Sequence, residues 1–176
     1  MENTPDQVLL DFSDPAAARS MRTVNDDVMG GVSAATVVSG EGTAVFQGTL
    51  SLKNFGGFAT CRTGPIQLDL SGYAGVCFRV KSDGRAYSVF LKNSAKDNGA
   101  NHTAEFIAPA DEWSVVRIPF ARMRPVFRGM SAPLAGKLDQ SDIRMIGFLI
   151  ADKQEDPFRI EIDWIGAYRE AASETK

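Results

Sequence analysis

The stretch FRIEIDW at residues 158–164 decides the fold class, because its hydrophobic residues fall on every second position. Successive side chains of a β-strand point to opposite faces of the sheet. One face therefore carries Phe158, Ile160, Ile162 and Trp164, and the other carries Arg159, Glu161 and Asp163. This alternation predicts a strand with one buried and one hydrated face.

Similar strand-sized runs occur along the rest of the chain, at residues 44–52, 76–80, 87–91, 103–108, 113–118 and 145–151. Turn-forming residues separate them, as at Gly40-Glu41-Gly42 and Asp156-Pro157. Residues 145–151 are hydrophobic on both faces, which predicts a central strand covered on both sides. Short strands between such turns predict an all-β sandwich or barrel.

The remaining segments are expected to be helical turns, loops and tails around one domain. Asp14 followed by Pro15 predicts the start of a short helix, and residues 140–143 predict a second helical turn. Residues 121–137 lack a strand pattern and are expected to form a long loop. We expect a single domain over residues 9–169, with an N-terminal tail at 1–8 and a C-terminal tail at 170–176.

Composition excludes several classes of function. The chain has 176 residues and a net charge of −3, so it lacks the basic field that nucleic-acid binding requires, and we expect no nucleic-acid partner. Two cysteines rule out a four-thiolate zinc site, and a single histidine rules out mechanisms that need two imidazoles. We expect no metal and no cofactor.

The chain start and the hydrophobic runs bear on location. Residues 1–6 are acidic and polar, unlike a basic secretory or mitochondrial leader. The hydrophobic run at 145–151 is far shorter than the roughly 18 residues that a membrane helix needs. We therefore expect a cytoplasmic protein with no membrane span.

A first candidate binding motif is Asn25-Asp26-Asp27 followed by Val28-Met29-Gly30-Gly31. These side chains could line a polar pocket that holds a cation or hydroxyl groups. They could equally form a structural turn in which the side chains cap their own backbone, which is the commoner use of such residues. The spacing does not match a calcium-binding loop.

Two further candidate motifs follow the same pattern of charged or polar residues beside turns. Asn54 begins a stretch with paired glycines that ends near Arg62, and local strand geometry is the simpler explanation for the glycines. Asp152, Lys153 and Gln154 follow the most hydrophobic strand, where they would form either a ligand-binding rim or a solvated hairpin turn.

The predicted long loop carries arginines and hydrophobic residues with no acidic residue among them. Arginine beside exposed aromatic and methionine side chains is typical of protein interfaces. This composition predicts a partner-binding loop, although a solvated loop is also consistent with it. Its candidate residues are Arg122, Arg124, Phe127 and Arg128.

Enzymatic function is not expected. His102 lies in a polar, turn-like stretch, and no nucleophile is marked beside it. Trp113 and Trp164 fit core positions by alternation, as do Cys61 and Cys77, which argues against an exposed aromatic platform for sugars.

Taken together, the motifs resemble the complex I intermediate-associated protein family, which is named after an assembly factor of mitochondrial NADH:ubiquinone oxidoreductase. The resemblance runs in order from about Leu9 to Tyr168. It is carried by VNDDVMGGVS (24–33), FQGTLSLKNFGGFATCR (46–62), DLSGYAGVCFRVKSDGRAY (69–87), WSVVRIPF (113–120), FRG (127–129) and IGFLIADKQEDPFRIEIDWI (146–165).

The resemblance implies a galactose-binding-like jelly roll and a non-enzymatic role as an assembly factor or chaperone, here in a stand-alone, bacterial-type member. It implies a protein partner, such as a respiratory-complex subunit or assembly intermediate. A carbohydrate or small-ligand binding module of the same fold is the alternative. We further expect Asp27, Arg62 and Lys153 to form one charged cluster beside the glycine turns.

Overall fold

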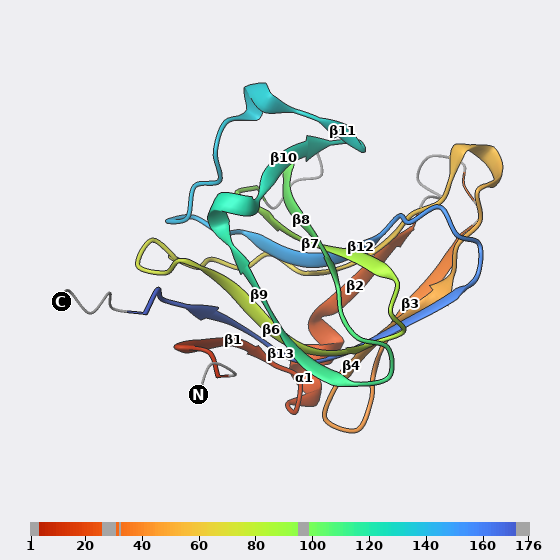
Figure 1. The fold of residues 1–176 in the computed structure, drawn as a ribbon, viewed down its shortest axis with the longest axis horizontal. Coiled ribbons are helices and arrows are strands. Elements are labelled where there is room, and N and C mark those ends of the chain that lie inside the picture. The colour runs from red at the N-terminus through yellow and green to blue at the C-terminus, as the bar shows by residue number, and fades with distance from the viewer. Residues whose placement is uncertain (1–3, 26–30, 32, 95–98, 172–176) are drawn as a thin grey trace.

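Antiparallel strands form two sheets that pack face to face (Figure 1). The computed structural model describes residues 4–25, 31, 33–94 and 99–171. The first sheet has six strands in the order β3-β4-β13-β6-β9, and β1 pairs with β13 beside this path. Its strands are β1 (Gln7–Asp11), β3 (Ala34–Ser39), β4 (Ala44–Thr49), β6 (Gly75–Ser82), β9 (Trp113–Pro119) and β13 (Pro157–Tyr168).

The second sheet has seven strands in the order β11-β10-β8-β7-β12-β5-β2. Its strands are β2 (Met21–Asn25), β5 (Ala59–Thr63), β7 (Ala86–Lys92), β8 (Asn101–Ile107), β10 (Arg124–Phe127), β11 (Met130–Ser131) and β12 (Met145–Ile150). The predicted central position of this strand is confirmed, because β12 lies between β7 and β5, and its Ile146, Phe148 and Ile150 are fully buried on the core face.

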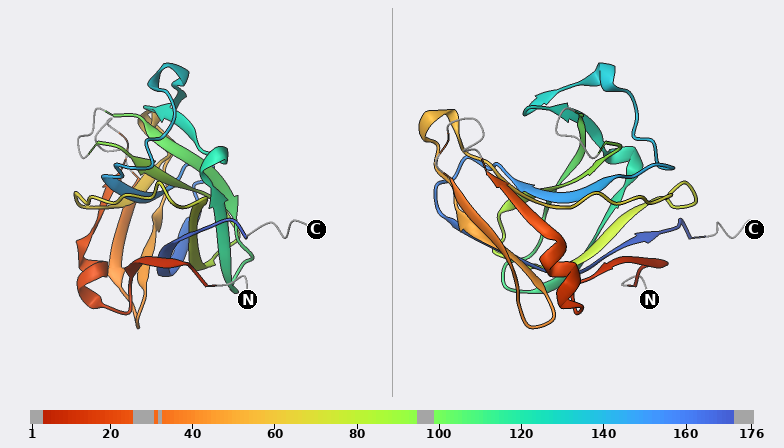
Figure 2. Two further views of the ribbon diagram at one scale, coloured as in Figure 1. Left: turned by 90° about the vertical axis from the view of Figure 1, so that its left-hand side faces the viewer. Right: turned by 180° about the vertical axis from the view of Figure 1, so that it is seen from behind.

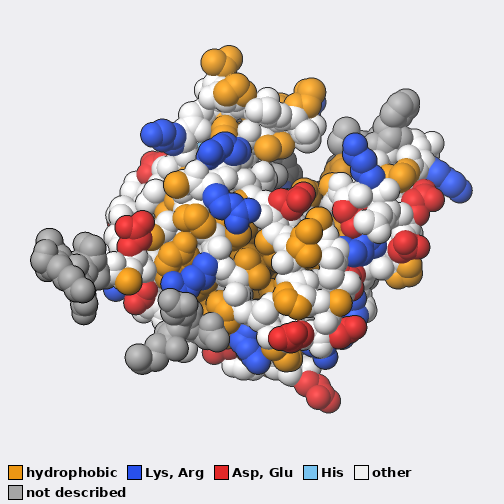
Figure 3. Space-filling model, in the orientation of Figure 1, with side chains coloured by type: hydrophobic (Ala, Val, Ile, Leu, Met, Phe, Trp, Pro, Cys, Tyr) orange, Lys and Arg blue, Asp and Glu red, His pale blue; other side chains and the backbone are white. Residues whose placement is uncertain are grey.

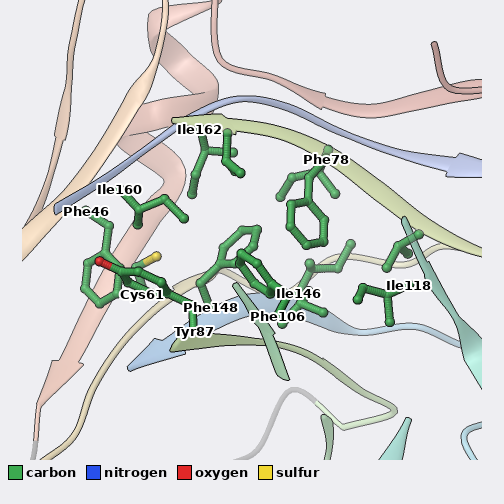
Figure 4. Packing of buried hydrophobic residues seen from close by; sticks show 14 of the residues in the cluster. Phe46, Cys61, Phe78, Tyr87, Phe106, Ile118, Ile146, Phe148, Ile160 and Ile162 are labelled. Atoms are coloured by element: carbon green, nitrogen blue, oxygen red, sulfur yellow. The ribbon is translucent and has the colours of Figure 1, made fainter. Parts of the chain in front are cut away.

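The core lies between the sheets and is rich in aromatic rings (Figure 4). Phe148 of the seven-stranded sheet meets Phe78 of the six-stranded sheet edge to face, with ring centroids 5.1 Å apart. Phe46 and Phe158, from neighbouring strands, make a similar contact at 5.0 Å. Such rings bury large hydrophobic areas and favour tilted contacts. The β-sandwich predicted from alternation is therefore confirmed.

The tryptophans depart from the predicted alternation. Phe158, Ile160 and Ile162 are buried as expected, but the pairing of β13 with β6 shifts register between Ile162 and Trp164. The shift sets Trp164 opposite Arg79 on the outer face, because a bulge adds one residue to the alternation. Trp113 also lies outside the core, where the Arg79 guanidinium stacks 4.5 Å from its ring centre.

One of the two expected helices is present. Helix α1 (Pro15–Ser20) begins after Asp14, whose side chain accepts a hydrogen bond from the Ala16 amide. Residues 140–143 are not helical: the Asp139 carboxylate accepts hydrogen bonds from the Ser141 amide and hydroxyl, and Ile143 bridges Leu68. Short 3-10 helices instead occur at η2 (Lys53–Phe55), η3 (Phe120–Arg122) and η4 (Pro133–Ala135).

The predicted long loop at 121–137 is wrong in part, because it contains β10 and β11. Strand β10 extends the sheet by pairing with β8. Figure 2 shows β10, β11 and η4 rising above the rest of the seven-stranded sheet, and we call residues 124–135 the arm. Sequence alternation missed this hairpin because its two strands have only four and two residues.

One smaller expectation also changes. His102 lies within β8 and is only 5% exposed, rather than sitting in an exposed turn. The domain bounds of 9–169 stay a prediction. Within the described residues, no helix has the length and hydrophobicity needed to cross a bilayer.

Candidate functional site

One motif residue, Asn25, lies at one end of the sandwich and lines a pocket of about 640 Å³. Asn25 lines it from the end of β2, Asp83 from the turn after β6, and Arg159 from the start of β13. The Asn25 side-chain oxygen is buried and has no hydrogen-bond partner. An unpaired buried acceptor is energetically costly.

Asp152 forms a buried ion pair with Arg85. The Arg85 Nε and Nη2 atoms donate to the two Asp152 carboxylate oxygens at 2.7 and 2.6 Å. The side chains are 10% and 6% exposed, respectively. Arg85 also donates to the carbonyl oxygens of Gln154 and Asp156. Asp152 therefore holds the 151–156 loop against the β6–β7 turn.

The pKa of Asp152 reflects this pairing. Burial raises the pKa of its carboxyl, but hydrogen bonds from Arg85 and from the Gln154 amide lower it by more. The net pKa lies below the ordinary value for an aspartate. The carboxylate is therefore charged at neutral pH and is already occupied by protein donors.

Asp83 is a second internal acceptor next to this pair. Its carboxylate accepts hydrogen bonds from the Tyr87 hydroxyl and from the Arg85 and Arg159 amides. Burial and the neighbouring Asp83 charge raise the pKa of the Tyr87 hydroxyl. A tyrosine with a raised pKa stays neutral and serves as a hydrogen-bond donor here, not as a base.

The polar loops at this end of the sandwich are tied to each other. The Glu155 carboxylate accepts a hydrogen bond from the Leu52 amide, which joins the 151–156 loop to the segment before β5. Asn54 and Lys153 both have positive φ angles, of 54° and 60°. Asn54 lies in a 3-10 segment and Lys153 in a bend, both between strands.

The expected cluster of Asp27, Arg62 and Lys153 remains a prediction. Asp26 and Asp27 lie outside the described residues. Arg62 lies opposite Gly147 in the middle of the sheet, on the face that points away from the core. Lys153 is in the loop three residues beyond the end of β12.

The arm holds three of the four predicted partner residues, and Arg122 lies just before it in η3. Arg122 donates to the Glu105 carbonyl, and Arg124 donates to the carbonyls of Ala121 and Met123. Arg128 has a positive φ of 49°, and its guanidinium stacks 5.2 Å from the Phe127 ring centre. Arg122, Arg124 and Arg128 are exposed, and Phe127 is half-buried.

Two large hydrophobic side chains of the arm face water. Met130 is 69% exposed and Leu134 is fully exposed. Figure 3 shows hydrophobic side chains at the top of this lobe, and a hollow between it and the lobe on the right. In the ribbon, the arm borders the hollow on one side and the segment carrying η2 borders it on the other (Figure 1).

The structure also identifies residues that sequence reasoning missed. Arg85 is essential to the Asp152 loop, and Arg22 and Phe90 share the outer face of the seven-stranded sheet with Arg62. The sequence marks Arg85 only by its place after the Asp83-Gly84 turn. Arg22 and Phe90 have no local signal, because their placement depends on strand pairing.

Groups for covalent or metal chemistry are not gathered in the described residues. No three of their His, Cys, Asp and Glu side chains are placed to hold a metal ion. Cys61 and Cys77 are buried, and burial raises their pKa values to about 12 and about 11. Protonated, buried thiols are poor nucleophiles.

Solved structures with the same architecture define the class of protein. The chain resembles a family 11 carbohydrate-binding module of a Clostridium thermocellum cellulase, with a TM-score of 0.66, 18% identity and coverage of 97% of this chain and 99% of that one. A second structure of that module, in complex with a mixed-linked tetrasaccharide, has a TM-score of 0.63 and 21% identity. The match covers 96% of this chain and 100% of that one. The fold is thus a galactose-binding-like jelly-roll sandwich.

The family follows from the sequence match. The model of the family "Complex I intermediate-associated protein 30" matches residues 10–162, so the chain belongs to that family. The mouse mitochondrial protein of that name is 29% identical over 111 residues, covering 61% of this chain and 34% of that protein. A probable Caenorhabditis elegans counterpart is 25% identical over 154 residues, covering 76% and 45%. The chain thus spans less than half the length of these relatives.

Proposed function

We propose that this chain is a non-enzymatic protein-interaction module that acts in the assembly of respiratory complex I. Its partner would be a complex I subunit or an assembly intermediate. Family membership supports this role, and the names of the mouse and nematode relatives refer to complex I. The observation that carries the proposal is the exposure of Met130 and Leu134 beside the arm's arginines.

Exposed hydrophobic side chains bordered by arginine are typical of protein interfaces. Both side chains are free of core packing, so removing them should leave the fold intact. The arm thus offers a contact surface that can be altered without disturbing the sandwich beneath it.

The test is affinity purification of the tagged protein from its own cells, with and without the double substitution Met130→Asp and Leu134→Asp. We expect complex I subunits to co-purify with the unaltered chain, and their amount to fall at least fivefold with the variant. The matched control places aspartates at Val8 and Val38, which are exposed hydrophobic residues of the six-stranded sheet. Equal recovery of complex I subunits with both double variants would contradict the proposal. The absence of complex I subunits from the purification of the unaltered chain would also contradict it.

Carbohydrate binding is the second candidate function, favoured by the fold and by the hollow beside the arm. Against it, Phe90 on the outer face of the seven-stranded sheet is only 2% exposed. Trp113 and Trp164 belong to the other sheet. Stacking on sugars needs exposed rings. Titration with a mixed-linked β-glucan tetrasaccharide tests this candidate, and we expect no binding.

A cytoplasmic location stays a prediction. Fractionation of the cells that make the protein would test it.

A further inference from the structure

Strand β9 forms an open edge of the six-stranded sheet. It is the last strand in the order β3-β4-β13-β6-β9 and pairs with β6 along its whole length, from Trp113 to Pro119. Within the described residues, no other strand lies along its second side. In Figure 1, β9 borders the sheet and leads through η3 toward the arm. An unpaired strand edge is a template on which another strand can pair.

The hydrogen-bond pattern shows which backbone groups of β9 point to the open side. The Phe120 amide donates to the Ala74 carbonyl at 3.0 Å, which continues the β6–β9 register by one residue. In an antiparallel pair, opposite residues alternate between bonding to each other and directing their backbone groups away. The even-numbered residues of β9 therefore bond to β6. The N–H and C=O groups of Trp113, Val115 and Arg117 point outward, and no described residue is hydrogen-bonded to them.

Side chains of β9 are also incompletely covered. Val116 faces the core yet is only half-buried. On the neighbouring strand β6, the core-facing residues Val76, Phe78 and Val80 are fully buried. Val115, on the outer face of β9, is half-buried as well. The open edge thus combines unpaired backbone groups with partly exposed hydrophobic side chains.

The sequence of β9 does little to protect this edge. Proteins commonly protect edge strands with lysine, proline or a bulge. Strand β9 has no lysine, its proline is its last residue, and its pairing with β6 shows no register shift. Val115, Val116 and Ile118 are β-branched, which favours strand formation. Arg117 is the strand's one charged residue.

We propose that β9 pairs with β9 of a second copy of this chain, antiparallel and centred on Val115. The two six-stranded sheets then join into one continuous sheet. This inference goes beyond the proposed function, because it concerns a surface other than the arm.

The backbone of β9 is complementary to itself in this register. Val115 lies opposite Val115 of the second copy, and Trp113 lies opposite Arg117. These are the residues whose N–H and C=O groups point outward, so each of those groups meets a partner.

Neighbouring registers satisfy fewer groups. A pairing centred on Ser114 leaves Arg117 beyond the end of the opposite strand. A pairing centred on Val116 sets Trp113 opposite Pro119, which has no N–H to donate. The register centred on Val115 therefore uses the open edge most completely.

The side chains are compatible with this register. Arg117, the one charged residue of the strand, faces Trp113 of the second copy and not another arginine. The Arg117 guanidinium stacks 4.7 Å from the Tyr168 ring centre, and the Trp113 ring stacks with Arg79. Backbone groups carry the pairing, so these stacked contacts can stay in place. Both copies use the same edge, and such an isologous contact closes as a dimer.

Sedimentation equilibrium of the purified chain tests the pairing. One pair of strands is smaller than a standard protein interface, so the association should be weak. The average mass should rise from 19.0 kDa toward twice that value as the concentration increases from about 5 µM to about 500 µM. The mass of a single chain at every concentration would overturn the inference.

Charge variants at the centre of the register test its geometry. Val115→Lys sets two lysines opposite each other, and Val115→Glu sets two glutamates opposite each other. Like charges directly opposite are destabilising, so each variant alone should associate about fivefold more weakly than the unaltered chain. An equimolar mixture of the two variants should recover the association, because lysine then faces glutamate. Failure of the mixture to recover it would overturn the inference.

A backbone variant tests the hydrogen bonds themselves. Val115→Pro removes an N–H that points to the open side and none of the bonds to β6, and proline is tolerated at such edge positions. It should also weaken the association about fivefold, because a central hydrogen bond is lost from each strand. Val115→Thr keeps the amide and the β-branched shape, and should change the association less than twofold. Equal association of the proline and threonine variants would contradict the pairing.

Two control variants place the contact on the molecule. Val38→Lys alters an exposed valine of β3 in the same sheet. Met130→Asp with Leu134→Asp alters the arm. Both controls should associate like the unaltered chain. Loss of association in the arm variant would place the contact on the arm, and equal loss in Val38→Lys would remove the special role of β9; either result would overturn the inference.

The outcomes separate this inference from the proposed function. Self-association of the purified chain without recovery of complex I subunits from cells would contradict the proposed function alone. Recovery of those subunits by a chain that stays monomeric would contradict this inference alone. A monomeric chain whose Val115→Lys variant no longer recovers the subunits would assign the edge to the partner, which also overturns pairing between copies.

Discussion

At the scale of single residues, the ion pair of Asp152 and Arg85 does most to hold the loop end of the sandwich. Both side chains are almost fully buried, and the arginine also donates to two loop carbonyls. Removing one partner of a buried pair leaves an uncompensated charge. Asp152→Ala should therefore lower the free energy of unfolding by about 3–5 kcal/mol, measured by urea denaturation.

Asp142→Ala is the matched control, because the Asp142 and Arg144 side chains are 39% and 38% exposed. An exposed pair contributes about 0.2–1 kcal/mol, so the control should lose far less stability. A similar loss of unfolding free energy in both variants would mean that burial does not increase the contribution of the Asp152–Arg85 pair to stability.

The pH dependence of the same residue has a definite sign. Its pKa is lowered in the folded protein, so the stability it contributes is present above the unfolded value of about 3.9 and is lost as pH falls through the folded value. The stability gap between the unaltered chain and Asp152→Ala should stay constant from about pH 7 to 5 and narrow below about pH 4. A gap that widens in acid would contradict the assignment.

The sequence marks Asp152 but not the residue that pairs with it. Its position after a hydrophobic strand is a local feature, whereas Arg85 is 67 positions away along the chain. Their contact depends on how β7 and β12 pair, which no local pattern specifies. The same holds for the orphaned Asn25 oxygen and for the arginines that face each other on β2 and β5.

At the scale of elements, β12 and β7 approach each other through Gly147. A Cβ atom there would lie 2.4 Å from the Phe90 ring and 2.5 Å from the Cys61 carbonyl oxygen. Gly147→Ala should therefore lower the free energy of unfolding by about 1–3 kcal/mol, since overpacking forces neighbouring strands apart. Chemical denaturation of this variant is the measurement.

Gly72→Ala serves as the control, because nothing lies within 4 Å of a Cβ atom built at that turn. It should change stability by less than about 0.5 kcal/mol. An equal change in unfolding free energy at both glycines would show that the close contacts around Gly147 do not make its substitution destabilising.

Alternation predicted the long elements well and failed at irregular ones. Strand β13 was predicted up to its bulge, where one extra residue moved Trp164 to the outer face. The arm was missed because its strands are too short to show a period, and His102 lies in a strand that begins within a polar stretch. Regular periodicity is a local signal, whereas bulges and short pairings depend on neighbouring strands.

At the scale of the whole molecule, the sequence predicts the two-layer sandwich because most of the predicted strands carry the same one-sided pattern. The arginines on the outer face of the seven-stranded sheet are a different kind of feature. They come from three strands that are distant in sequence, and only the order of the sheet brings them into a row. Family membership supports the proposed role in complex I assembly.

Site-specific photo-crosslinking in the protein's own cells tests the central claim most directly. A photoreactive phenylalanine at Leu134 sits on the exposed part of the arm, and one at Val38 sits at an exposed hydrophobic position of the six-stranded sheet. The account predicts crosslinks from position 134 to a complex I subunit or assembly intermediate, and none to such proteins from position 38. The opposite pattern, or no such crosslink from position 134, would contradict it.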